Sequence, residues 1–434
     1  MTMRSVAVLG LGLAVPLGPL AGQQLTATER AEAVATIWAE ARYNFASWER
    51  VRADWDSALA ANLKQAAQPQ SDVLFYRRLR RLVALLGDGQ AAVIPPANLR
   101  SRIARPPLLV TSVERRPLVL EYAENDEMRV ARPDRLAEIL AVQGVPAESW
   151  IRDSVLPEIS AATPADRWQR AVQWMLQGEK GTTLHLLLRV PGGNQRGISV
   201  TRSVSLNDRW PLDPPELQID SLPDGVIVAR VNALAEEDVV RRFDRSFTDF
   251  AGVSGLILDL RRAAGGDSRY GYAILARLTR RAFPTARWRT PQYRPVFRAL
   301  RVPDSAFSWY GPPPDTVTPS VDRPAYTGPI VVLASSGTGG AAEDFLVAFR
   351  NAARGVIIGE TSAGSPGEAL ALPLPKNWAV QLSVTRHAFP NGEEVAGVGI
   401  RPEFPVACTV DDVLAGRDPV LERAREYLKG GTGR

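Results

Sequence analysis

A short apolar run that enters a small, glycine-rich turn is the feature that most constrains this chain. Residues 330–333 read Ile-Val-Val-Leu, residues 335–340 read Ser-Ser-Gly-Thr-Gly-Gly, and a helix is predicted to begin near Ala341. In a strand–turn–helix unit the turn lifts one side chain, and the first helix amides point at negative charge that develops beside it. Hydrolases display nucleophiles in such turns, so the segment favours a hydrolase-type site on an α/β scaffold.

Strands and helices alternate around this segment, over a predicted core of residues 216–408. A layered α/β core is expected because strands are interleaved with helices of ordinary length. The predicted strands are 226–231, 255–260, 330–333, 356–358 and 380–385, and the predicted helices are 239–250, 268–278 and 341–353. In the last segment, residues 409–434, Asp418 and Pro419 start a C-terminal helix.

The first half of the chain has two further patterns. Residues 23–104 are predicted to form a helical domain, which opens with a capping box at Thr26 and Glu29. Residues 105–205 contain short strands that end in a hairpin, with helices predicted at 135–142 and 151–159. Together with Gln-Gly-Val-Pro at 143–146, this order resembles a divergent PDZ domain, a module that binds chain ends by strand addition.

The N-terminus and the overall charge bear on location and partners. Arg4, an apolar stretch from Val6 to Leu20 and small residues up to Gly22 predict a signal peptide, residues 1–22, of an exported periplasmic or secreted protein. The stretch is too short to span a membrane, and no nearby cysteine offers a lipid anchor; a buried N-terminal segment is the alternative. Although the net charge is +5, the arginines are scattered, which argues against a nucleic-acid partner. The single cysteine, Cys408, excludes an internal disulfide and a cysteine-based metal cluster, and no cofactor is expected.

Five segments resemble, in order, elements of the tail-specific (C-terminal-processing, tricorn-core-like) serine protease family. That resemblance implies a ClpP/crotonase-like layered core with a PDZ-like insert, acting on peptides or protein C-terminal tails. The nucleophile region of the family reads approximately Ser-x-x-Thr-x-Ser-Ala-Ala-Glu. The matching segments are Leu85–Gln90, Gly255–Arg261 with Gly265-Gly266, Ser335–Glu343, Ile358–Gly364 and Pro390–Glu403.

The resemblance also shows that the residues of the reaction are replaced. Gly340 stands at the nucleophile position, Gln90 at the histidine position and Ala396 at the glutamate position of the tricorn-like branch. The lysine position of the other branch holds Ser365. A hydroxyl needs a base to accept its proton, and the amide of a glutamine is not one near neutral pH.

The binding residues implied by the resemblance are retained. Gly265 and Gly266 match the loop whose amide faces the oxyanion, and the Ala341 amide would be the second donor. A plain tight turn at the two glycines is the alternative. We therefore expect an exported family member that binds peptides or C-termini with little or no hydrolysis, a pseudoenzyme.

Two other functions stay open. An active serine endopeptidase could use Ser336 or Ser335 with His387, because only His185 and His387 could supply an imidazole base. Alternatively, the chain is a non-catalytic structural or interaction protein.

Overall fold

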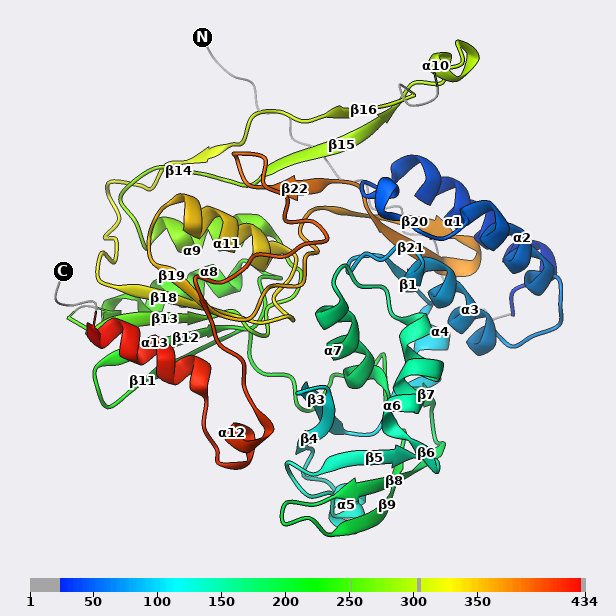
Figure 1. The fold of residues 1–434 in the computed structure, drawn as a ribbon, viewed down its shortest axis with the longest axis horizontal. Coiled ribbons are helices and arrows are strands. Elements are labelled where there is room, and N and C mark those ends of the chain that lie inside the picture. Colours follow the sequence, from blue (N-terminus) through cyan, green and yellow to red (C-terminus); the bar gives the residue numbers. More distant parts are fainter. Residues whose placement is uncertain (1–23, 251, 303–305, 431–434) are drawn as a thin grey trace, which may run out of the picture.

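The computed structural model describes residues 24–250, 252–302 and 306–430 (Figure 1). The predicted signal peptide lies outside these residues. Within the described part of the chain, no helix is both long enough and apolar enough to cross a membrane.

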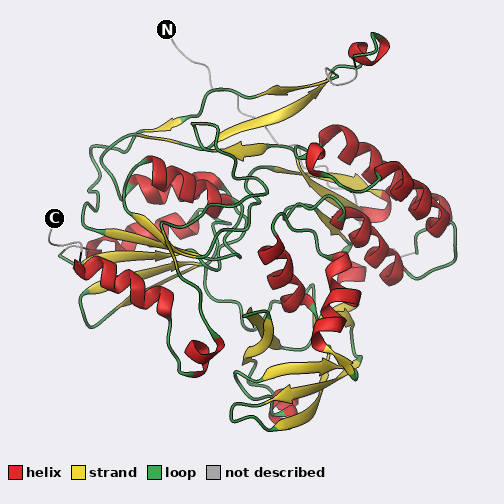
Figure 2. Ribbon diagram, in the orientation of Figure 1, coloured by secondary structure: helices red, strands yellow, loops and turns green. Residues whose placement is uncertain are grey.

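A six-stranded sheet forms the α/β core, in the order β11-β12-β13-β18-β19-β23. Only β11 runs antiparallel to its neighbour. The layered class predicted from the alternation is confirmed (Figure 2). The bounds are β11 Leu217–Ser221, β12 Val226–Val231, β13 Gly255–Asp259, β18 Ile330–Ala334, β19 Val356–Gly359 and β23 Phe404–Pro405.

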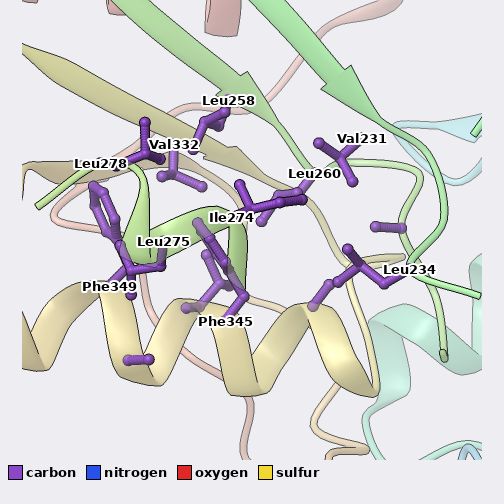
Figure 3. Packing of buried hydrophobic residues seen from close by; sticks show 14 of the residues in the cluster. Val231, Leu234, Leu258, Leu260, Ile274, Leu275, Leu278, Val332, Phe345 and Phe349 are labelled. Carbon is purple, nitrogen blue, oxygen red and sulfur yellow. The ribbon is translucent and has the colours of Figure 1, made fainter. Parts of the chain in front are cut away.

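Helices cover both faces of this sheet because side chains along each strand point alternately to opposite faces. On one face, Leu258 and Val332 pack against Ile274 of α9 and Phe345 of α11 (Figure 3). On the other, residues such as Ile257 meet the C-terminal helix α13. The helices are α8 Asp238–Arg245 with η4 Ser246–Phe250, α9 Ser268–Ala276, α11 Ala341–Asn351, α12 Val410–Leu414 and α13 Pro419–Gly430.

The insert is an α+β unit with its own core, which contains only residues between Leu108 and Val200. Its sheet has the order β3-β4-β5-β8-β9, with β6 paired to β5. The unit comprises β3 Leu108–Val113, β4 Arg116–Tyr122, α5 Asp126–Ala131, β5 Glu138–Val142, β6 Val145–Pro146, α6 Ala147–Trp150, η2 Ile151–Val155, η3 Leu156–Glu158, α7 Pro164–Trp174, β8 Thr183–Arg189 and β9 Gln195–Thr201. A small sheet of β2 Ile103–Arg105, β7 Gly178–Glu179 and β10 Val204–Ser205 adjoins it.

The helix predicted over 135–142 is wrong. Residues 138–142 form strand β5, which pairs with β4 and β8. Leu136 has a φ of +64°, which no helix interior allows. Tertiary pairing therefore decides the conformation of a segment whose apolar spacing also suits a helix.

The N-terminal part packs helices against a sheet that the late chain completes. Strand β1 pairs with β21, and β21 pairs with β20. The strand predicted at 380–385 thus exists but belongs to this sheet rather than to the core sheet, because Trp378 packs against Phe75 and Tyr76. The elements are α1 Ala27–Asn44, η1 Trp48–Arg50, α2 Trp55–Ala66, α3 Asp72–Ala84, β1 Ala92–Ile94, α4 Ala97–Arg100, β20 Ala369–Leu374, η6 Pro375–Asn377 and β21 Trp378–Ser383.

A long hairpin extends along the edge of the molecule (Figure 1). Its strand β15 pairs with β16 and, at the other end, with β22. The elements are β14 Phe283–Pro284, β15 Arg287–Tyr293, α10 Val296–Ala299, β16 Phe307–Tyr310, β17 Thr316–Val317 and β22 Arg386–Ala388.

Candidate functional site

The turn between β18 and α11 is held rigidly against the neighbouring strand. Thr338 is fully buried, and its hydroxyl donates to the carbonyl of Leu260 (2.9 Å) and accepts from the amide of Ser335 (3.0 Å). Gly340 is the N-cap of α11, with φ +58° and ψ −128° and no side-chain cap on the helix. The turn therefore presents position 340 in a conformation that residues with a side chain rarely adopt.

The glycine loop after β13 packs directly on this position. A Cβ atom on Gly340 would lie 2.7 Å from the Cα of Gly265 and 2.9 Å from its nitrogen, which is closer than real Cβ contacts. The Gly265 amide donates to the carbonyl of Gly339 (3.2 Å), so this donor is used within the protein. The turn therefore engages the Gly265 N–H in this structure, and the oxyanion role of Gly265, Gly266 and Ala341 stays a prediction.

Gln90 lies beside Gly340. Its side-chain amide donates to the carbonyls of Ser365 (3.1 Å) and Gly367 (2.6 Å), and the Gly340 amide donates to the same Ser365 carbonyl (3.2 Å). The predicted base position and the predicted nucleophile position thus meet at one oxygen atom. Gln90 acts here as a hydrogen-bond donor that fixes the loop at 365–367.

The segment with the buried Ser365 connects the predicted base position with the predicted acid position. Its hydroxyl accepts from the Gly89 amide (3.1 Å). Next to it, the carbonyl of Gly364 accepts from the Gly397 amide (2.6 Å), the residue after Ala396. The Arg50 guanidinium donates to the carbonyls of Ala396 and Gly397. The predicted acid position is therefore adjacent to the same loop, and the Arg50 guanidinium binds its backbone carbonyl.

A buried carboxyl, Glu343, connects α11 to this loop. It accepts from the Ser362 hydroxyl (2.5 Å) and from the amides of Gly364 (2.7 Å) and Ser365 (2.8 Å). Burial raises the pKa of Glu343 to about 8, although these three donors favour its anion. The residue retained from the family's motif thus has a structural role in this chain.

His387 is buried and does not contact the candidate serines. Its Nδ1 lies 2.8 Å from Asp344 Oδ1, and its Nε2 lies 3.2 Å from Thr385 Oγ1. Ser335 instead donates to the carbonyl of Arg261 (2.7 Å), and the Ser336 amide lies 3.4 Å from Glu360. The structure therefore does not form the pairing of Ser335 or Ser336 with His387. The other histidine, His185, is exposed on β8, where it meets Ser199 (3.0 Å).

Sequence reasoning missed Asp344 and Thr385. Two signals could have found them: adjacent acids at 343 and 344 in an otherwise small and apolar helix start, and the spacing of Thr385 and His387, which places alternate residues of an extended chain on one face. Among the described residues, no cluster of histidine, cysteine and acidic side chains could hold a metal ion.

Known proteins share both the sequence and the fold. Residues 226–406 match the family model described as Peptidase family S41. The chloroplastic C-terminal processing peptidase of Tetradesmus obliquus is 23% identical over 401 residues, which cover 90% of this chain and 78% of that protein. The carboxyl-terminal-processing protease of Picosynechococcus sp. is 24% identical over 375 residues, or 85% and 80% of the two chains.

Two solved structures have the same architecture. Mature CPAF aligns over 93% of this chain and 96% of its own, with a TM-score of 0.69 and 16% identity. The photosystem II D1 C-terminal processing protease aligns over 88% and 94%, with a TM-score of 0.50 and 19% identity. The resemblance to the tail-specific proteases that the motifs predict is confirmed by sequence and by fold. The match to the S41 model spans the α/β core, residues 226–406.

Proposed function

We propose that this protein is an exported member of the tail-specific protease family that binds peptides or protein C-termini and hydrolyses them little or not at all at the family's centre. The observation that carries the proposal is Gly340: it stands where the nucleophile belongs, and the Gly265 backbone fills the space of a side chain. Loss of a serine nucleophile reduces turnover by about a million-fold in an established serine protease. The amide of Gln90 is too weakly basic to accept a proton near neutral pH, so the base function is lost as well.

Peptide binding is proposed at the edge of the PDZ-like insert. Strand β3 is an edge strand, and α7 packs alongside it. The Ser112 amide donates to the side-chain carbonyl of Gln169 (3.2 Å), and Thr111 accepts from the same side chain (3.1 Å). Gln169 thus occupies the hydrogen-bonding edge that an added peptide strand would use, and a bound peptide would displace it.

The test compares binding with cleavage on the same peptides. Unstructured peptides with a free C-terminal carboxylate, and matched peptides with an amidated C-terminus, are titrated calorimetrically and then analysed by mass spectrometry after prolonged incubation. We expect saturable binding that is weaker for the amidated peptides, and intact peptides at the end.

Two outcomes contradict the proposal. Rapid cleavage that disappears in Ser336→Ala or Ser335→Ala would support the active serine endopeptidase. Absence of binding to any peptide would support the non-catalytic structural or interaction protein.

A further inference from the structure

We propose that Thr385, His387 and Asp344 form a second hydroxyl–imidazole–carboxylate relay beside the replaced centre, in which Thr385 is a nucleophile toward acyl and phosphonyl groups. This inference goes beyond the proposed function and does not rest on it, because the relay requires no peptide-binding site. It would give slow hydrolysis of activated esters.

The hydrogen bonds define the direction of the relay. The Thr385 oxygen accepts from the Glu368 amide (2.7 Å), so its own proton is available to His387 Nε2 at 3.2 Å. On the other side of the ring, Nδ1 lies 2.8 Å from Asp344 Oδ1, and this carboxylate accepts a hydrogen bond from Nδ1–H. Nε2 is then the nitrogen with a free lone pair, which is the tautomer that a hydroxyl nucleophile needs.

The carboxylate end of the relay is fixed and shielded from water. Asp344 is 1% exposed and His387 is 6% exposed. The Ser268 hydroxyl from α9 donates to Asp344 Oδ2 (2.6 Å), which holds the carboxylate in its orientation. Thr385, in contrast, is only half-buried. Thr385 is therefore the least buried residue of the relay.

The relay lies next to the Gly340 turn. The Asp344 amide donates to the carbonyl of Gly340 (3.3 Å), one helical turn earlier in α11. Gly367 covers the hydroxyl and the ring: a Cβ there would lie 3.0 Å from Thr385 Oγ1 and 3.2 Å from His387 Cδ2. The Gly367 carbonyl is the one that Gln90 holds. Thr385 therefore lies close to the predicted nucleophile position at Gly340.

Charged groups around His387 come from three elements. Asp344 and Glu343 lie on α11, and Glu368 lies in the segment before β20. The Tyr272 phenol of α9 interacts electrostatically with Asp344 and Glu368 as well. Burial lowers the pKa of His387, but the charge and hydrogen bond of Asp344 outweigh burial and raise it above its ordinary value. Asp344 thus stabilises the imidazolium that forms when His387 accepts the proton of Thr385.

The reaction balances with water as the only co-reactant. Thr385 Oγ1 bonds to the acyl carbon of the ester while its proton moves to His387 Nε2, and the bond to the leaving alcohol breaks as that alcohol takes the proton. Water then attacks the acyl-threonine ester, its proton passes to Nε2, and Thr385 recovers a proton as the free acid leaves. With a fluorophosphonate, the Oγ1–phosphorus bond forms and fluoride leaves with the proton as hydrogen fluoride.

The experiment maps a covalent adduct on the full chain. A fluorophosphonate probe is reacted with the protein, the adduct is located by peptide mass spectrometry, and p-nitrophenyl acetate hydrolysis is followed in parallel. We expect the adduct on Thr385 and a loss of about 100-fold or more in both rates for Thr385→Val and His387→Gln. Thr385→Ser should keep or increase the rates, because it retains the hydroxyl.

The matched control is Thr290→Val. Thr290 is also half-buried, and its hydroxyl donates to the carbonyl of Val384 (2.8 Å), next to Thr385. This variant should react like the wild type, and thermal unfolding of every variant separates lost chemistry from lost folding. In the wild type the labelling rate should rise with pH, with a midpoint above the 6.5 of an ordinary histidine.

Three results would overturn the proposal: an adduct on any residue other than Thr385, no adduct on either the wild type or Thr385→Ser, or unchanged rates in a folded His387→Gln variant. Failure of peptide binding alone would contradict the proposed function but not the relay, because the fluorophosphonate and the ester react without the peptide site.

Discussion

Gly340 combines two obstacles to a side chain. Its φ of +58° is strained for any residue other than glycine, and the Gly265 backbone lies within 2.9 Å of the position that a Cβ would occupy. We expect Gly340→Ser to lower the free energy of unfolding by about 2–4 kcal/mol. Urea unfolding would measure this, and Gly337→Ser in the same turn is the control, because a Cβ there meets only ordinary contacts at 3.4 Å or more. An equal loss in both variants would contradict the prediction.

We expect hydrolysis at the family's centre only when Gly340, Gln90 and Ala396 are all substituted by the residues that the family has there. Gly340→Ser alone should not cleave unstructured peptides, because Gln90 cannot accept the serine proton. Combined with Gln90→His and Ala396→Glu, it should show measurable cleavage, since Gln90 and Gly340 already share the Ser365 carbonyl. Cleavage by the triple variant also requires the Gly265 loop to move, because its backbone fills the space of a Cβ at position 340. Cleavage by the single variant would refute this account.

The buried Glu343 predicts a pH-dependent stability. Its pKa is about 8 in the folded protein against 4.5 for a free glutamate, so between these values the folded state holds a proton that the unfolded state has lost. The free energy of unfolding should therefore fall by a few kcal/mol as the pH rises from about 5 toward 8. Glu343→Gln should flatten this dependence in urea titrations at several pH values. A stability that rises with pH over this range would show that the three donors keep Glu343 ionised.

The sequence motifs predict which residues stand at the family's catalytic positions but not the surroundings of these residues. Gly340, Gln90 and Ala396 could be located because flanking residues keep the family's pattern. The contact of Arg50 with the 396–397 backbone and the use of the Gly265 amide depend on side-chain and loop positions that one-dimensional spacing does not encode. Thr385 was missed for the same reason, since its partner Asp344 lies on a different element.

At the scale of single elements, the proposed peptide site lies along β3, beside α7. We expect Gln169→Ala to tighten binding of peptides with a free C-terminus about fivefold, because the peptide no longer displaces a hydrogen bond worth about 1 kcal/mol. Calorimetric titration measures the change. Gln173→Ala, exposed on the same helix, should leave the affinity unchanged. Unchanged binding in Gln169→Ala would mean that peptides do not use the β3 edge.

Most elements could be predicted from periodicity and caps. The capping box of α1, the buried strand β13 and the start of α11 lie where local signals place them. Segment 135–142 could not be predicted, because its apolar residues fit either a helix or a strand. Strand β21 was predicted as a strand, but pairing with β1 depends on residues almost 300 positions earlier, which no local pattern records.

At the scale of the whole molecule, the hydrophobic core of the N-terminal part depends on distant residues of the chain, and the core of the insert does not. The N-terminal core includes Leu374, Trp378, Val380 and Leu382 from the late chain, whereas the insert's core is local. We expect a fragment of residues 24–104 to lack cooperative thermal unfolding, and a fragment of residues 102–206 to unfold cooperatively. Circular dichroism melts of the two fragments test this. A cooperative melt of the first fragment would contradict it.

The pairing of β1 with β21 also sets an order of events during synthesis. A ribosome makes the chain from its N-terminus, so α1 to α3 emerge long before the strands that complete their core. Because nearly 290 residues separate the two partners, these helices must wait with an exposed apolar face while the insert folds first. Their Trp and Leu side chains then form the surface that a holding chaperone would recognise in the nascent chain.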